Sequence, residues 1–102
     1  MFNQKNILTL LTVVCCSFII HAQDLTKLSY AEIDSLTYVE YSKGAFDRAI
    51  PLMQAGRDKA KIEFGQQDSV FAEYTNNLGF FYNEMGNYEK ALPLYIQAKN
   101  IY

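Results

Sequence analysis

The chain has 102 residues, with 9 Lys and Arg against 11 Asp and Glu and a formal net charge of −2 at pH 7. A mildly acidic chain of mixed charge is poorly suited to bind nucleic acid, because phosphate backbones are held mainly by clustered Lys and Arg. Its only Cys and His residues are Cys15, Cys16 and His21. All three lie near the N-terminus, which limits the chemistry that the rest of the chain can perform.

Residues 1–22 have the pattern of a secretory signal peptide. Lys5 precedes the apolar run 7–20, and Ala22 stands before the polar Gln23. A basic start, a short apolar segment and a small residue at the junction are typical of export signals. The run is about 14 residues long, shorter than the roughly 20 that span a bilayer. We expect cleavage after Ala22 and a secreted or periplasmic protein with no other membrane contact; an uncleaved membrane anchor and a lipid-modified Cys are the alternatives.

Export predicts a defined N-terminus. Mass spectrometry of the protein expressed in a bacterial host is expected to find a mature chain that starts at or near Gln23, because signal peptides are removed after the small residue that ends them. Recovery of a cytosolic protein that still begins at Met1 would contradict export.

The residues after position 22 contain no Cys, His or Trp. They cannot form a disulfide, a thiolate nucleophile, a zinc site of Cys and His, or a catalytic triad based on His. Their acidic residues are scattered over different predicted helices, as on solvated faces, rather than paired for acid–base chemistry. We therefore predict no catalytic residue, no metal site and no cofactor, and do not expect an enzyme.

Four helices are predicted after a short linker at 23–28. Apolar residues recur three or four positions apart through each helix, with charged residues on the other faces. Ser29 and Glu32 have the spacing of a capping box at the start of the first helix. Gly residues follow the first three helices, where a left-handed residue ends a helix at the lowest cost. The predicted helices cover residues 30–43, 46–63, 69–85 and 88–102.

Nearly the same phrase occurs twice, as GAFDRAIPLM from Gly44 and as GNYEKALPLY from Gly86, 42 positions later. Each copy covers a turn and the start of the helix that follows it. Short turns make consecutive helices antiparallel, so the helices pair as hairpins. The predicted fold class is all-α, with two stacked antiparallel helical hairpins. The repeated units are about 30–71 and 72–102, and the second is truncated.

The second unit resembles a tetratricopeptide repeat, whose characteristic residues are matched by Leu78, Gly79, Tyr82, Gly86, Tyr88, Ala91, Tyr95 and Ala98. The first unit departs from that pattern at Thr37, Glu40 and Gly56. The long spacing is similar to that of kinesin light chain repeats and of repeat arrays in bacterial secreted proteins, including those ahead of caspase-like CHAT peptidase domains. The resemblance implies that the hairpins begin an α-solenoid and that Gly79 faces Ala91 where two helices approach closely.

The resemblance also implies a binding surface. In tetratricopeptide arrays the first helix of each hairpin lines a concave groove for a protein or peptide partner, and Asn amides suit a peptide backbone because they donate and accept. The residues expected in this groove by repeat position are Asn76, Phe80 and Asn83 in the second unit and Asp34, Tyr38 and Tyr41 in the first. The alternative is that the rings belong to the core and the Asn residues are ordinary solvated side chains.

Two functions fit these features. The first is an exported scaffold for protein–protein interaction that binds a partner along the groove. The second is the N-terminal repeat region of a larger enzyme or sensor, a CHAT peptidase or a histidine kinase, whose catalytic domain is absent from this chain. In either case an apolar C-terminal edge is expected to dock a further hairpin or a second copy, since repeats bury their apolar faces against neighbours. The residues of that edge are Tyr95, Ile96, Ile101 and Tyr102.

Overall fold

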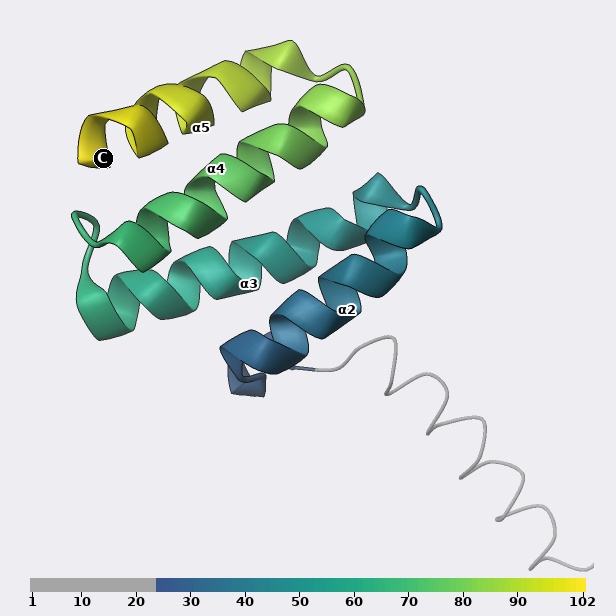
Figure 1. Cartoon of the computed structure of the whole chain (residues 1–102), viewed down its shortest axis with the longest axis horizontal. Coiled ribbons are helices and arrows are strands. Elements are labelled where there is room, and N and C mark those ends of the chain that lie inside the picture. The colour runs from purple at the N-terminus through teal and green to yellow at the C-terminus, as the bar shows by residue number, and fades with distance from the viewer. Residues whose placement is uncertain (1–23) are drawn as a thin grey trace, which may run out of the picture.

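The computed structural model describes residues 24–102, in which helices follow one another as predicted (Figure 1). The predicted signal peptide lies outside the described residues. A short 3-10 helix, η1 (Leu25–Lys27), precedes four α-helices, which are α2 (Tyr30–Ser42), α3 (Phe46–Phe64), α4 (Ser69–Glu84) and α5 (Tyr88–Ile101). No strand occurs in residues 24–102, and the all-α fold class is confirmed.

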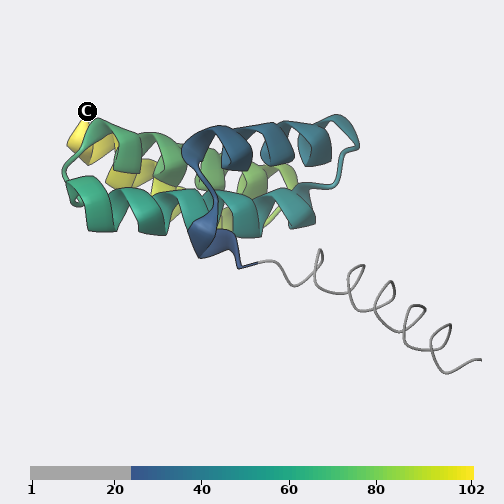
Figure 2. The same ribbon diagram turned by 90° about the horizontal axis from the view of Figure 1, so that it is seen from below.

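The four α-helices form two hairpins that pack side by side. Helices α2 and α3 run antiparallel, as do α4 and α5, and contacts between α3 and α4 join the hairpins (Figure 1). Seen from below, α2 and α3 lie one above the other (Figure 2). Because α3 runs opposite to both of its neighbours, α2 and α4 point in the same direction.

Local signals start and end these helices as predicted. The Ser29 hydroxyl accepts a hydrogen bond from the Glu32 amide at 3.2 Å, and the Glu32 carboxylate accepts one from the Ser29 amide at 3.0 Å. This capping box satisfies amides that the first turn of α2 leaves without a helical partner. Gly44 and Gly86, which open the two copies of the repeated phrase, have φ angles of 71° and 77°. Any other residue would strain the backbone there.

The segment predicted as a linker is part of the fold from residue 24 onward. Asp24 accepts a hydrogen bond from the Thr26 amide at 3.1 Å and so caps η1. Leu28 is only 5% exposed and packs into the core. A helix of three residues is too short to show a period of apolar residues, so the sequence pattern could not predict it.

The core consists of apolar side chains from η1's C-terminal flank and from α2, α3 and α4, namely Leu28, Ile33, Ala49, Leu52, Met53, Tyr74, Leu78 and Phe81. Two hydroxyls are buried beside them. Thr37 donates to the Ile33 carbonyl and Thr75 to the Phe71 carbonyl, each at 2.7 Å. Both buried hydroxyls are therefore hydrogen-bonded, whereas an unpaired one would destabilise the fold. Thr37 can therefore stand in the core although it departs from the repeat pattern.

Gly79 faces Ala91, as the resemblance implied. A Cβ atom at Gly79 would lie 3.3 Å from the Ala91 carbonyl oxygen, and equally close to Leu94 Cβ and Tyr95 Cδ1. Such distances are at the short end of van der Waals contact. The absence of a side chain at Gly79 thus lets α4 and α5 approach closely.

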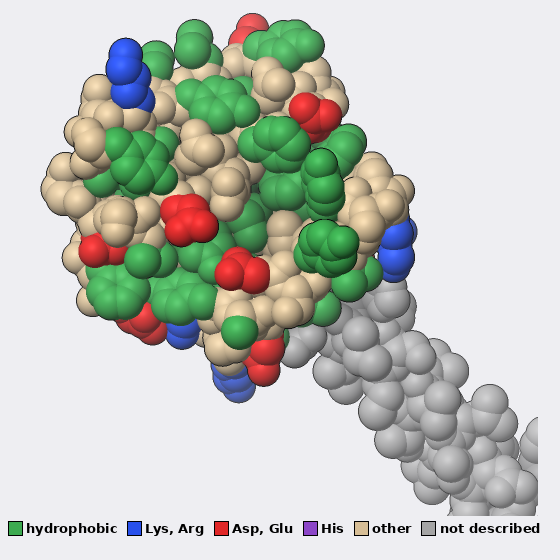
Figure 3. Space-filling view, in the orientation of Figure 1, with side chains coloured by type: hydrophobic (Ala, Val, Ile, Leu, Met, Phe, Trp, Pro, Cys, Tyr) green, Lys and Arg blue, Asp and Glu red, His purple; other side chains and the backbone are tan. Residues whose placement is uncertain are grey.

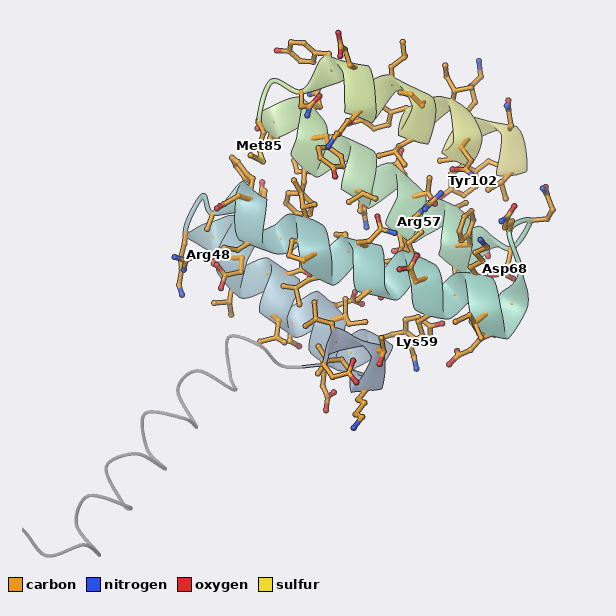
Figure 4. All side chains as sticks on the ribbon, turned by 180° about the vertical axis from the view of Figure 1, so that it is seen from behind. Arg48, Arg57, Lys59, Asp68, Met85 and Tyr102 are labelled. Atoms are coloured by element: carbon orange, nitrogen blue, oxygen red, sulfur yellow. The ribbon has the colours of Figure 1, made fainter. Side chains whose placement is uncertain are left out.

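Arg57 connects the two hairpins on the face seen in Figure 4. Its Nε donates to Thr75 Oγ1 at 3.0 Å, and its Nη2 donates to Gln97 Oε1 at 2.8 Å. The guanidinium also lies 4.9 Å from the centre of the Phe71 ring, within the range of a cation–π contact. One side chain of α3 therefore holds both helices of the second hairpin.

Candidate binding groove

A groove of about 320 Å³ runs between α2 and α4, with α3 beneath it. The residues of α2 that line it are Asp34, Thr37, Tyr38 and Tyr41, and those of α4 are Glu73, Asn77, Phe80 and Phe81. Met53 of α3 also lines it and is 2% exposed. Figure 3 shows this face of the molecule, on which hydrophobic and acidic side chains occupy the middle and Lys and Arg side chains lie toward the rim.

One end of the groove is aromatic. The Tyr41 ring centre lies 6.2 Å from that of Phe80 and 6.3 Å from that of Phe81, and the last two rings meet edge to face at 5.3 Å. Mutual contacts of this kind hold aromatic rings in defined orientations. Tyr38, in contrast, is 70% exposed and makes no ring contact among the described aromatic pairs. The groove therefore offers both a packed apolar wall and a free aromatic side chain.

The other end is acidic. Tyr74 donates its hydroxyl to Asp34 Oδ1 at 2.8 Å, and Glu73 precedes Tyr74 in α4. Burial raises the pKa of Tyr74 above its usual value, and the hydrogen bond to Asp34 and the charges of Asp34 and Glu73 raise it further. A tyrosine phenol is already protonated near neutral pH, and the raised pKa lets Tyr74 keep donating to Asp34 at higher pH as well. Both carboxylates line the same groove.

The common direction of α2 and α4 separates these two ends. Asp34 and Glu73 come early in their helices, whereas Tyr41 and Phe80, whose rings are in contact, come late. One end of the groove therefore carries the carboxylates and the other carries the rings. Asn77 lies between them along α4 and is half-buried. The groove thus runs from carboxylates, past an amide, to aromatic rings.

Four of the six predicted groove residues line it together, namely Asp34, Tyr38, Tyr41 and Phe80. Asn76 and Asn83 are not among the residues that line it, and their role in binding stays a prediction. Both are exposed and lie three or four residues from both Gly79 and Phe80, so on α4 they stand between the side that faces α5 and the side that lines the groove. Asn77 takes the place expected for an amide.

Sequence reasoning missed three groove residues of α4, which are Glu73, Asn77 and Phe81. A helical signal for them exists in the sequence. Positions 73, 77, 80 and 81 are four, seven and eight residues apart, which is the spacing of one helical face. The spacing alone does not say which way this face of α4 points in the fold. The hydrogen bond from Tyr74 to Asp34 shows that it points toward α2.

A second apolar surface lies on α5. Tyr88, Leu92 and Ile96 are exposed and four residues apart, and Tyr102 is 73% exposed at the end. Of the predicted edge, Tyr95 and Ile101 are half-buried instead. The equivalent residues of the first unit, 42 positions earlier, are Phe46 and Ile50 of α3, and both pack against the core. Docking of a further hairpin or a second copy on α5 stays a prediction.

Within residues 24–102, no group of three or more His, Cys, Asp or Glu side chains is placed to hold a metal ion. None of the helices in this part of the chain has the length and apolar character needed to cross a membrane. Comparison of the chain with models of protein families, with curated proteins and with solved structures found no match, so a functional assignment has to rest on the groove itself.

Proposed function

We propose that this chain is an exported module for protein–protein interaction, with a tetratricopeptide-like arrangement that binds an extended peptide of a partner protein between α2 and α4. The observation that carries the proposal is the groove itself, which takes its walls from the first helix of each hairpin. An enzyme is not proposed, because the groove side chains include no nucleophile paired with a base.

The chemistry of the groove suits a peptide better than a nucleic acid or a small cofactor. Asp34 and Glu73 would repel phosphate groups. An amide such as that of Asn77 can donate to a peptide carbonyl and accept from a peptide amide. Exposed Tyr38 offers a large contact area with few rotatable bonds, a property that favours Tyr at interfaces with proteins.

The proposal predicts that Tyr38 contributes to peptide binding. Peptides selected from a random phage-displayed library on the purified protein are expected to bind less well to a Tyr38→Ala variant, by about 1 kcal/mol or more of binding free energy. The melting temperature should hardly change, because the site is exposed and such substitutions alter stability by about 0.5 kcal/mol or less. Fluorescence anisotropy measures the affinity, and circular dichroism measures the stability.

A double Asn variant of α4 is the matched control for Tyr38→Ala. Asn76→Ala combined with Asn83→Ala is expected to bind the selected peptides as the parent does, since neither residue lines the groove. If this variant loses binding while Tyr38→Ala retains it, the peptide contacts the exposed Asn residues of α4 outside the α2–α4 groove instead. Retained affinity in both variants would contradict a site on this face.

A further inference from the structure

We infer that the groove selects peptides in which a basic side chain and an apolar side chain lie two to three residues apart. The basic side chain binds at the Asp34–Glu73 end, and the apolar one packs at the Tyr41–Phe80 end. This inference rests on the proposed function, since it names the class of peptide that the groove takes.

The charge of the groove argues for a cationic partner. Its lining includes two carboxylates and no Lys or Arg. The salt bridge found in the described part of the chain joins Lys59 and Glu63, neither of which lines the groove. A carboxylate can accept several hydrogen bonds, so Asp34 retains acceptor capacity beside its bond from Tyr74. Two carboxylates in a groove that no Lys or Arg lines create a negative potential that a guanidinium or ammonium group would neutralise.

The bond from Tyr74 makes this acidic end a defined site. Tyr74 is 5% exposed, and its ring stacks on that of Tyr30 at 5.7 Å between centres. Its hydroxyl therefore has little freedom and holds the Asp34 carboxylate in one place. A positioned carboxylate binds a cation with less loss of side-chain entropy than a mobile one.

The other end of the groove is apolar. Tyr41 is 47% exposed and rests against Phe80 and Phe81. A partner side chain that covers these rings removes apolar surface from water, which favours binding. The rings already contact one another, so they need little reordering when the partner arrives.

The distance between the two ends sets the spacing. Asp34 and Tyr41 are seven positions apart in α2, which corresponds to about 10 Å along the helix. An extended chain advances about 3.3–3.6 Å per residue, so about three residues cover this length. Asn77 lies between the ends, where its amide can bond the peptide backbone.

The test uses the peptides selected from the random library on the purified protein. Arg or Lys is expected to be enriched two or three positions from an apolar residue. The variant Asp34→Asn/Glu73→Gln should bind an enriched peptide about ten-fold or more less tightly, as for lost hydrogen bonds to a charged group. Asn at position 34 can still accept from Tyr74, so the fold is kept, which a melting curve checks.

Two controls isolate the charge. Asp58→Asn/Glu89→Gln removes the same number of charges from exposed sites outside the groove and should leave the affinity unchanged. Replacing the basic residue of the peptide by Gln should weaken binding to the parent but not to Asp34→Asn/Glu73→Gln. Raising the salt from about 0.1 M to 1 M shortens the screening length from about 10 Å to 3 Å. It should therefore weaken binding to the parent more than binding to Asp34→Asn/Glu73→Gln.

The inference and the function that it rests on fail differently. Enrichment of neutral or acidic peptides, or full affinity in Asp34→Asn/Glu73→Gln, would overturn the choice of a basic ligand. If those peptides still shift the NMR signals of Tyr38 and Asn77, the groove remains a peptide site. If the selected peptides shift only signals from the outer faces of α3 and α5, both proposals are wrong.

Discussion

Replacement of Gly56 by Ala is expected to destabilise the fold, although Ala is the better helix former. A Cβ atom at Gly56 would lie 2.5 Å from Tyr74 Cδ1 and 2.9 Å from Tyr74 Cζ, so the ring would have to move. That ring is held on three sides, by the core, by stacking on Tyr30 and by the bond of its hydroxyl to Asp34. Moving it would break the bond to Asp34 and separate α3 from α4.

We expect a net loss of about 1–3 kcal/mol in the free energy of unfolding. This net figure already allows for the helix propensity of Ala, which offsets about 1 kcal/mol of the cost of the clash. For a domain of this size, each 1 kcal/mol corresponds to about 4–8 °C in melting temperature, which calorimetry or circular dichroism resolves. The same change in a Tyr74→Ala background should stabilise the fold by up to about 1 kcal/mol, because the clash is then absent and only the helix propensity of Ala remains. Equal melting temperatures for Gly56→Ala and the parent would contradict the contact.

Gly79→Leu is expected to have an effect of about 1–3 kcal/mol or more in the same direction. The space beyond Gly79 is bounded by the Ala91 carbonyl oxygen, Leu94 Cβ and Tyr95 Cδ1, each 3.3 Å from the position of a Cβ atom. The carbonyl belongs to the backbone of α5 and cannot rotate away. Only a shift of the whole helix makes room for Leu, and that shift opens the second hairpin.

A matched substitution controls for the choice of Leu. Asn76→Leu places the same side chain on the same helix at an exposed position, where stability should change by about 0.5 kcal/mol or less. Urea unfolding of both variants and the parent gives the comparison. If Gly79→Leu unfolds at the same urea concentration as the parent, the close approach of α4 and α5 at Gly79 is wrong.

The sequence by itself determined the helices and their order. Amphipathic period, the capping box at Ser29 and the glycines at the turns are signals between residues a few positions apart, and they act before the helices meet. The repeated phrase also identified the two hairpins. Repeat position, taken from the resemblance to tetratricopeptide repeats, implied that Asp34, Tyr38 and Tyr41 line the groove, as they do.

Tertiary packing alone decided how α4 is rotated about its axis. Adjacent residues of a helix point about 100° apart, so the rotation of α4 about its axis decides whether Asn76 or Asn77 lines the groove. That rotation depends on contacts between distant residues, such as Tyr74 with Asp34, 40 positions apart, and Arg57 with Thr75, 18 positions apart. The burial of rings and the fit of Gly56 against Tyr74 set these contacts, and no local pattern of residues encodes them.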